Sequence, residues 1–242
     1  MRSGHLASLP PGSLAGDLRG GGKTPCWMVT AEEAEAAQPF EHEPKPGHRR
    51  NVWNINISSW YSHGEALLEE ATRCNVHAIC VSESNLTTTS FRGAAAMASR
   101  MGWHIRGTPK PAKGRGGTLL CVREPASLSG ITHFRSEAGQ ITQATVEGWG
   151  QPITLLAFYR RQPHDSTFNA ESQRSLGALR GRPWIAAGDW NQPVMEEEAL
   201  ITWDSVGGSI IACSGHIRSP SPIDGVWCSG EVQPQRCFST VI

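Results

Sequence analysis

From residue 51 onward, short apolar runs alternate with amphipathic stretches, whereas the first fifty residues show no sustained period of 2 or 3.6. Continuous or alternating apolar residues predict strands over 51–58, 76–82, 117–123, 141–147, 152–159, 183–189 and 221–229. Apolar residues at helical spacing predict helices over 64–74, 91–101 and 169–179. Strands outnumber helices, and hairpins mix with crossovers. Two mixed sheets packed face to face, with helices on the outside, would bury this pattern.

The first fifty residues form a separate region. They are interrupted by proline and glycine and cannot bury enough apolar area to offset chain entropy, so we expect a disordered tail over 1–50 and a folded domain over 51–242. The tail contains the run GGGKT at 20–24, which is reminiscent of a phosphate-binding loop. The earlier glycine of such a loop falls on Asp17, and no strand precedes it, so we interpret the run as a flexible linker.

Composition narrows the class of protein. Lys and Arg together number 22, as do Asp and Glu, so the balanced charge argues against a globally basic nucleic-acid coat protein. No apolar stretch approaches the length of a membrane span, so we expect no membrane partner. The seven cysteines contain no C-x-x-C pair, which argues against zinc and favours reduced core thiols. We therefore expect an intracellular protein, with the nucleus as one candidate compartment.

Polar side chains stand where the apolar strands stop. These strand-end residues are Asn54, Asn56, Glu83, Tyr159, Asp189 and Asn191. Any one of them alone is more typical of a residue that closes a turn. Together they supply oxygen ligands, which Mg²⁺ prefers, and one or two carboxylates suffice for that ion because it keeps several waters. The pattern predicts a magnesium site built on Glu83 and Asp189, with Asn54 nearby.

Six short motifs occur in order along this part of the chain. They are WNIN (53–56), CVSESNL (80–86), GGTLLCVR (116–123), LLAFY (155–159), AGDWN (187–191) and IDGVW (223–227). In this order they resemble the motifs of the endonuclease/exonuclease/phosphatase superfamily. Within it, the chain looks most like the endonuclease module of non-LTR retroelements and the related apurinic-site nucleases.

The resemblance implies a four-layer α/β sandwich and cleavage of a phosphodiester that depends on Mg²⁺, with Mn²⁺ as a substitute. Carried over by motif, Glu83 is a metal ligand and Asn54 lies at the metal, while Asn56 falls in the same network. The remaining motif residues would act on substrate: Tyr159 and Asn191 at the phosphate, Asp189 on the attacking water, and Asp224 in orienting a catalytic histidine.

One family motif does not appear. The superfamily places Ser-Asp-His after the position of Asp224, whereas the given sequence reaches Ile242 without it, and His216 precedes Asp224 in chain order. We therefore expect a sandwich without its last strand and a domain that is incomplete at its C-terminal end. As a fragment or a degenerate copy, the chain alone should cleave only weakly.

Charge distribution adds a hint about the substrate. Residues 84–182 carry 13 basic and 5 acidic side chains, whereas the segments that flank them are acidic. We expect Lys113 and Arg115, in the basic loop 107–117, and Arg160 to contact substrate phosphates. A loop that is merely kept soluble by its charges explains the same residues equally well.

DNA is accordingly the expected partner, and no protein partner can be inferred. Two alternatives stay open. One is a phosphatase or phospholipase of the same superfamily, and the other is a non-catalytic remnant that binds nucleic acid.

Deletion of the tail tests whether it contributes to the stability of the domain. Deleting residues 1–50 should leave the melting temperature within about two degrees of the full-length value, because a disordered segment buries almost no apolar area. Differential scanning calorimetry of both proteins tests this. A large drop would show that the tail packs against the domain.

Overall fold

The computed structural model describes residues 50–162, 165–191, 207–215, 222–229 and 232, with the side chains of 210–215 and 222–224 excluded. The expected tail lies almost wholly outside these ranges, and so does His216, so the predicted domain boundary stays a prediction. The elements in chain order are β1 (Val52–Asn56), α2 (Trp60–Arg73), β2 (Ala78–Ser82), α3 (Thr88–Arg100), β3 (Trp103–Thr108), β4 (Thr118–Arg123), β5 (Ser127–Arg135), β6 (Gly139–Glu147), β7 (Ile153–Arg160), α4 (Ser166–Gly177), β8 (Trp184–Asp189), β9 (Gly208–Gly215) and β10 (Pro222–Ser229).

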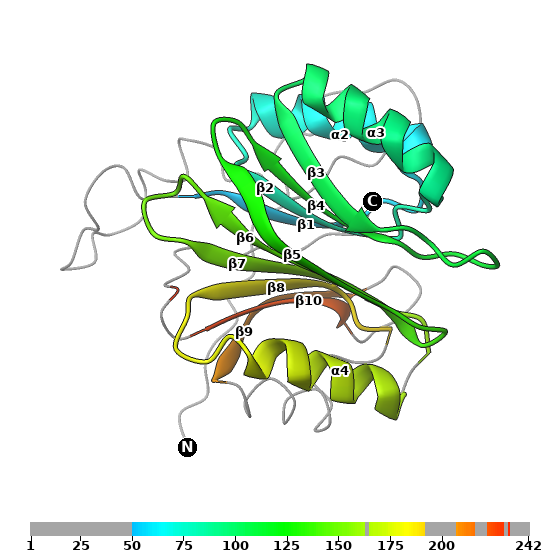
Figure 1. Cartoon of the computed structure of the whole chain (residues 1–242), viewed down its shortest axis with the longest axis vertical. Helices are drawn as coiled ribbons and strands as arrows, with labels where there is room; N and C mark the ends of the chain where they lie inside the picture. The colour runs from blue at the N-terminus through cyan, green and yellow to red at the C-terminus, as the bar shows by residue number, and fades with distance from the viewer. Residues whose placement is uncertain (1–49, 163–164, 192–206, 216–221, 230–231, 233–242) are drawn as a thin grey trace, which may run out of the picture.

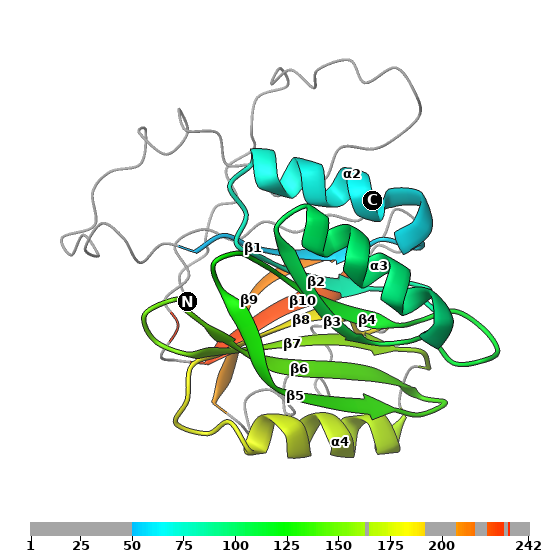
Figure 2. The same cartoon turned by 45° about the horizontal axis from the view of Figure 1, so that its top comes forward.

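The strands form two sheets of mixed direction. One sheet has the order β1-β2-β4-β3, and the other has the order β5-β6-β7-β8-β10-β9. The pairs β1–β2 and β7–β8 are parallel, and the other pairs are antiparallel. The sheets pack face to face, with α2 and α3 over the first and α4 over the second (Figures 1 and 2). The expected four-layer α/β sandwich is confirmed. Among the described strands β1 ends the first sheet, and the absence of a further strand stays a prediction.

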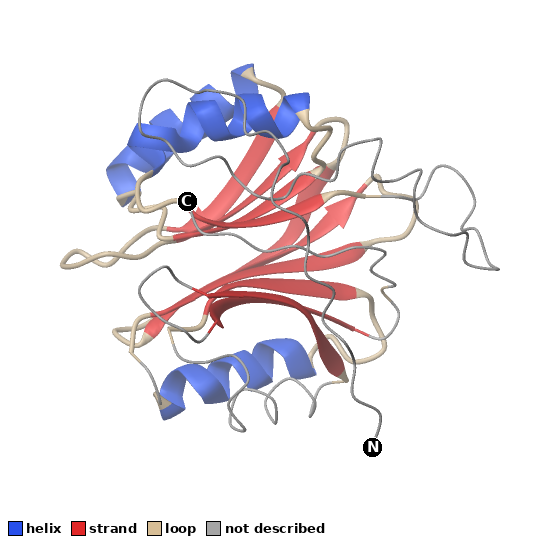
Figure 3. Ribbon diagram, turned by 180° about the vertical axis from the view of Figure 1, so that it is seen from behind, coloured by secondary structure: helices blue, strands red, loops and turns tan. Residues whose placement is uncertain are grey.

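The alternation of side chains along each strand accounts for the layers. In β2, Ile79 and Val81 belong to the apolar cluster beneath α2 and α3, whereas Ala78 and Cys80 belong to the cluster between the sheets. The third cluster fills the space between the second sheet and α4, around Trp190. Figure 3 shows the two strand layers enclosed by helices on their outer sides. Because successive residues of a strand face opposite sides, every central strand contributes to two of these clusters.

The three helices begin about one turn earlier than the apolar spacing predicts. Thr87 caps α3, since its Oγ1 accepts a hydrogen bond from the backbone N–H of Ser90 at 3.1 Å and the Ser90 hydroxyl accepts one from the Thr87 N–H at 2.8 Å. Asp165 caps α4 through the backbone N–H of Phe168 at 2.8 Å. Short polar residues in a first turn satisfy the free N–H groups but carry no apolar periodicity.

Three strands, β3, β5 and β9, were not predicted. β3 and β5 carry a broken apolar pattern, and most β5 side chains are exposed or half-exposed. All three lie at the ends of their sheets. An end strand has only one neighbouring strand, so it is held by backbone hydrogen bonds with fewer buried side chains, and the sequence signal is correspondingly weak.

The described cysteines are free thiols, and three of them are buried. Burial raises the pKa of Cys80 to about 12. The expectation of reduced core thiols is thus confirmed for Cys80, Cys121 and Cys228, whereas the side chain of Cys213 lies outside the described part. No helix within the described ranges is long and apolar enough to cross a membrane.

Acid should weaken this fold through His77. Its Nδ1 accepts a hydrogen bond from the Asn51 N–H at 3.1 Å. Burial first, and then the charges of Arg50 and Arg123, lower the pKa of His77 below its usual 6.5. The unfolded chain therefore binds this proton more readily than the folded chain, and the contribution of His77 to stability falls as the pH drops below about 6.5. We expect the urea midpoint of the wild type to fall relative to that of a variant without this imidazole between pH 7 and pH 5.5.

The variant His77→Gln, whose amide oxygen can accept the same hydrogen bond, should show a smaller decrease than the wild type. His63→Gln, at an exposed position of α2, is the matched control and should keep the wild-type dependence. Equal pH dependence in the wild type and His77→Gln would contradict the assignment.

Candidate active site

The carboxyl ends of β1, β2, β7 and β8 meet at one edge of the sandwich, on the right in Figure 1. Trp53 and Ile55 pack beneath the outer helices, so Asn54 and Asn56 face the second sheet. From that sheet, Asp189 ends β8. Strand direction and alternation alone thus bring polar residues of both sheets to one place.

Asp189 is the most enclosed carboxylate of the site, with 3% of the residue exposed. Its Oδ2 accepts a hydrogen bond from Nδ2 of Asn56 at 3.2 Å, and its Oδ1 accepts one from the backbone N–H of Asn191 at 2.8 Å. Burial raises the pKa of Asp189 to about 7, and the charge of Glu83 adds to the rise, while both hydrogen bonds act in the opposite direction. The carboxylate is therefore held by donors from both sheets beside a second negative charge.

Glu83 follows β2 directly and is half-exposed. Its backbone is left-handed, with φ at +53°, and Asn191 has φ at +50°. Each such residue other than glycine costs about 1–3 kcal/mol and persists only where its surroundings enforce it, often at a functional site. Both strained residues border Asp189, one through charge and one through a hydrogen bond.

Tyr159 stands beside both carboxylates. It is the register partner of Asp189 in the parallel pair β7–β8, and it shares a side-chain hydrogen bond with Glu83. Burial, and then the charges of Glu83 and Asp189, raise the pKa of Tyr159 well above its usual value. The phenol therefore keeps its proton and acts as a hydrogen-bond donor.

The structure describes the remaining predicted catalytic residues, Asn54, Asn191 and Asp224, in different detail. Asn54 is buried on the same face of β1 as Asn56. The Nδ2 of Asn191 donates to the backbone carbonyl of Arg160, so this side chain closes the turn after β8. The backbone of Asp224 lies opposite Asp189 in the antiparallel pair of β10 and β8, whereas its side chain lies outside the described part. The catalytic roles of these residues stay predictions.

The structure does not bring the side chain of Arg160 to this site. It is fully buried on the opposite face of β7, where its guanidinium lies 5.0 Å from the ring centroid of Trp190 and its Nε donates to the carbonyl of Gln162. Arg161 lies on the site side instead, because its charge acts on Tyr159. The sequence led us to expect Arg160 at the substrate, because it does not give the register of β7, which decides which of the two neighbouring arginines faces the site.

A double-glycine turn, Gly116–Gly117, anchors the basic loop to the site, and we call it the latch. The Gly116 N–H donates to Oδ1 of Asn85 at 3.1 Å, and its carbonyl accepts from the Asn85 N–H at 2.8 Å. The Gly117 carbonyl accepts from the Ser84 N–H at 3.1 Å, and its N–H donates to Oε1 of Gln140 at 2.9 Å. All four backbone polar groups of the latch are bonded to residues outside the basic loop.

Only glycine fits the latch. Its φ values are +133° and +89°, which side chains disfavour. A Cβ added at Gly116 would lie 2.6 Å from Oε1 of Gln140, and one added at Gly117 would lie 2.6 Å from the hydroxyl of Ser84. The sequence marked this glycine pair as part of a motif and of the basic loop at the start of a strand. It gave no sign of Gln140, which is one of several polar residues along β6.

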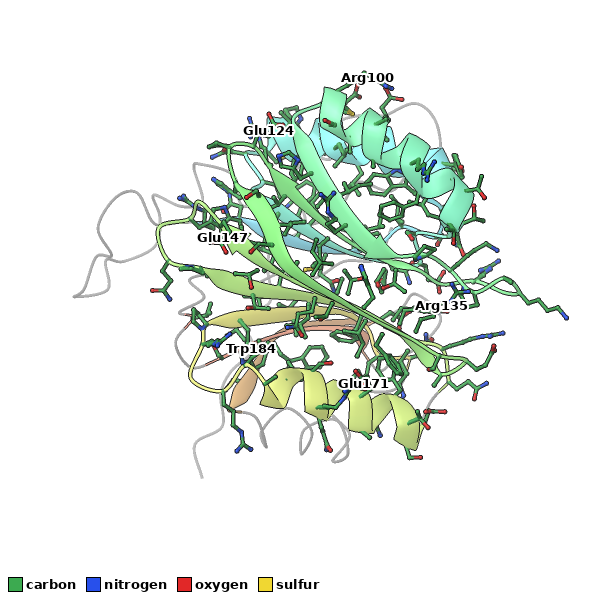
Figure 4. All side chains as sticks on the ribbon, viewed as in Figure 1. Arg100, Glu124, Arg135, Glu147, Glu171 and Trp184 are labelled. Atoms are coloured by element: carbon green, nitrogen blue, oxygen red, sulfur yellow. The ribbon has the colours of Figure 1, made fainter. Side chains whose placement is uncertain are left out.

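The latch carries a short basic arm, which we define as residues 109–115. Its predicted substrate residues, Lys113 and Arg115, are both exposed. A Cβ added at Gly114 would lie 3.0 Å from the guanidinium of Arg161, so this arginine lies beside the arm. Figure 4 shows Arg135, at the end of β5, on the same edge of the molecule. Cations of the arm, of the end of β5 and of the segment after β7 therefore lie at the same edge of the molecule as the two carboxylates.

The site residues fit a divalent cation. Glu83 and Asp189 supply carboxylate oxygens, and Asn54, on the face of β1 that is turned toward the second sheet, supplies an amide oxygen, all of which a hard cation accepts as ligands. Asn56 instead presents its amide N–H to Asp189. The charge of Glu83 raises the pKa of Asp189, and a dication would offset this repulsion. Within the described residues no three His, Cys, Asp or Glu side chains form a metal cluster, so a cation here would depend on amides or water as well as on the two carboxylates.

Solved structures share this sandwich. The 3′ phosphatase NExo from Neisseria, bound to a product DNA hairpin, has a TM-score of 0.60 at 12% identity, covering 76% of this chain and 88% of that one. An AP endonuclease from Archaeoglobus fulgidus has a TM-score of 0.54 at 14% identity, with coverages of 76% and 88%. A Leptotrichia buccalis C-1013-b protein described as belonging to the endonuclease/exonuclease/phosphatase family reaches 0.58 at 12% identity, with coverages of 78% and 91%.

The comparison with curated proteins found no match. The family model described as the endonuclease/exonuclease/phosphatase family matches residues 51–239, which include every predicted catalytic and metal residue. The solved structures agree with that model in fold. The chain therefore belongs to the endonuclease/exonuclease/phosphatase family.

Proposed function

We propose that this protein hydrolyses phosphodiester bonds of DNA with Mg²⁺ as its cofactor, in the manner of a retroelement-type endonuclease. The family sets the broader chemistry, which is hydrolysis of phosphodiester or other phosphate-ester bonds, generally with divalent metal ions. The observation that carries the proposal is the Asp189 carboxylate, held by Asn56 from the facing sheet beside Glu83 and Tyr159.

Each side chain of the cluster has a distinct task in this reaction. Glu83, with Asn54 on the neighbouring strand β1, would hold the cation, which would supply a Lewis acid that neutralises charge on the phosphate. Asp189 takes the proton of the attacking water. Asn56 and the backbone N–H of Asn191 hold that carboxylate in a fixed direction.

Tyr159 keeps its proton and, when substrate is bound, would turn the hydrogen bond that it makes to Glu83 toward a phosphate oxygen, where negative charge grows as the water attacks. This task requires a protonated phenol, and burial beside two carboxylates provides one.

DNA is favoured over a lipid or a small phosphate by the positive charges around the site. The exposed Lys113 and Arg115 on the arm, with Arg135 at the end of β5 and Arg161 after β7, would contact phosphates on either side of the cleaved bond. Among the similar structures, one contains a DNA hairpin and one is an AP endonuclease. The narrower retroelement assignment rests on the six ordered sequence motifs.

Magnesium binding should depend on Glu83. We expect Mg²⁺ at ten times its Kd to stabilise the wild type by about 1.4 kcal/mol, since only the folded chain forms the site. Glu83→Gln should lose most of this gain, measured by urea unfolding and isothermal titration with Mg²⁺ and then Mn²⁺. Glu69→Gln, an exposed change on α2, is the matched control and should keep it. Equal Mg²⁺ affinity in the wild type and Glu83→Gln would remove this residue from the metal site.

Cleavage should depend on Asp189. Asp189→Asn keeps the size of the side chain but removes the proton acceptor, so the rate of nicking of supercoiled plasmid in Mg²⁺ should fall by about 10²–10⁴-fold. Asp165→Asn is the control, because asparagine also caps helices and α4 lies on the opposite face of the second sheet. Nicking that persists in EDTA, or in Asp189→Asn, would refute the proposed mechanism. Hydrolysis of p-nitrophenyl phosphate without nicking would favour a phosphatase instead.

A further inference from the structure

We propose that Gln140 is a positioning residue: it sets the basic arm against the active site and so favours polynucleotides that are long enough to reach the arm over short phosphodiesters. The inference rests on the proposed function and adds a preference for substrate length. Gln140 is not among the motif residues of the sequence, and it acts through the latch rather than on the reacting atoms.

Gln140 lies where the latch and the catalytic cluster meet. It is fully buried at the start of β6, and its register partner on β7 is Tyr159. A Cβ added at Gly116 would lie 2.6 Å from Oε1 of Gln140 and 3.2 Å from the Tyr159 ring. The glutamine, the latch and the tyrosine are therefore in close contact, so a shift of the latch would move the arm relative to the site.

The two ends of the Gln140 amide are used differently. Oε1 accepts the hydrogen bond of the Gly117 N–H at 2.9 Å, whereas Nε2 is buried and finds no partner in the described structure. Buried donors are nearly always bonded, and one that is not opposes folding. Stability alone would therefore favour an apolar side chain here. The amide instead supplies one acceptor, and that acceptor is directed at the latch.

The arm is fixed at both of its ends. At the first end, the Lys110 N–H donates to the Leu86 carbonyl at 2.8 Å, and the Lys110 ammonium reaches across to the Gly114 carbonyl at 3.1 Å. At the second end, the latch is held by Gln140. A pre-ordered arm presents its cations without the entropy loss of ordering a free loop. Only a strand with phosphates beyond the cleaved bond can use them.

The test compares two substrates. The variant Gln140→Met removes the acceptor of the Gly117 N–H, which destabilises the fold. It also removes the unpartnered donor Nε2, which stabilises the fold, so the two changes in stability oppose each other. The substrates are a 30-base-pair duplex and a thymidine dinucleotide, and kcat and KM are measured in Mg²⁺. We expect kcat/KM for the duplex to fall about tenfold through KM, with kcat and the dinucleotide rate unchanged. The readout is therefore the ratio of the two kcat/KM values.

Two further variants complete the comparison. Gln140→Glu retains an acceptor for the Gly117 N–H and should keep the wild-type ratio, even where its added charge lowers both rates. Gln143→Met lies on the same strand, but its side chain is half-exposed, and it should match the wild type. Gln140→Leu also removes the acceptor of the Gly117 N–H, and it replaces Gln140→Met if that variant does not fold.

Equal losses on both substrates in Gln140→Met, or no loss on the duplex, would overturn the inference. Binding separates its failure from that of the proposed function. Without metal, the anisotropy of a labelled duplex should show a weaker dependence on salt for Gln140→Met, by about one phosphate contact. A wild type that binds the duplex in this Gln140-dependent way but never cuts it would refute only the nuclease. A wild type that does not bind the duplex would overturn both.

Discussion

A hydrogen bond from Asn56 to Asp189 joins the two sheets at the candidate active site. The two residues are 133 positions apart in the sequence. Their contact exists only when the sheets are packed at the right separation, and small side chains such as Ala144, Ala157 and Ala187 in the layer between the sheets set that separation. A hydrogen bond to a charged group contributes about 1.5–3 kcal/mol. Its larger effect is that the core and the site cannot form independently.

Several features of the candidate site lower the stability of the fold that holds it. Glu83 and Asn191 have left-handed backbones, and Asp189 is buried near a like charge. These features persist because apolar layers on both sides of each sheet keep the strand ends in place, with Trp103 and Trp184 among the fully buried side chains. A rigid scaffold that carries strained polar loops is the arrangement that fixed catalytic geometry requires.

Much of this site could be predicted from sequence because strand ends and alternation are local properties. Asn56 and Asp189 are the last residues of β1 and β8, and the shared facing of Asn54 and Asn56 follows from a period of two. The choice between Arg160 and Arg161 depends on the register of β7, which no local pattern specifies. Gln140 could not be found either, because its proposed role depends on its hydrogen bond from Gly117, in the turn that precedes β4 of the other sheet. Contacts between residues that are far apart in the sequence cannot be predicted from local patterns.

The latch has a consequence for how such a protein can change over time. Gly116 and Gly117 bond only to residues outside the arm, and residues 112–115 at the tip of the arm are all exposed. An insertion or a new set of side chains there alters what the molecule touches without disturbing its carboxylates. The exposed tip of the arm can therefore change during evolution while the latch and the two carboxylates stay in place. Such changes would alter which substrates the protein contacts.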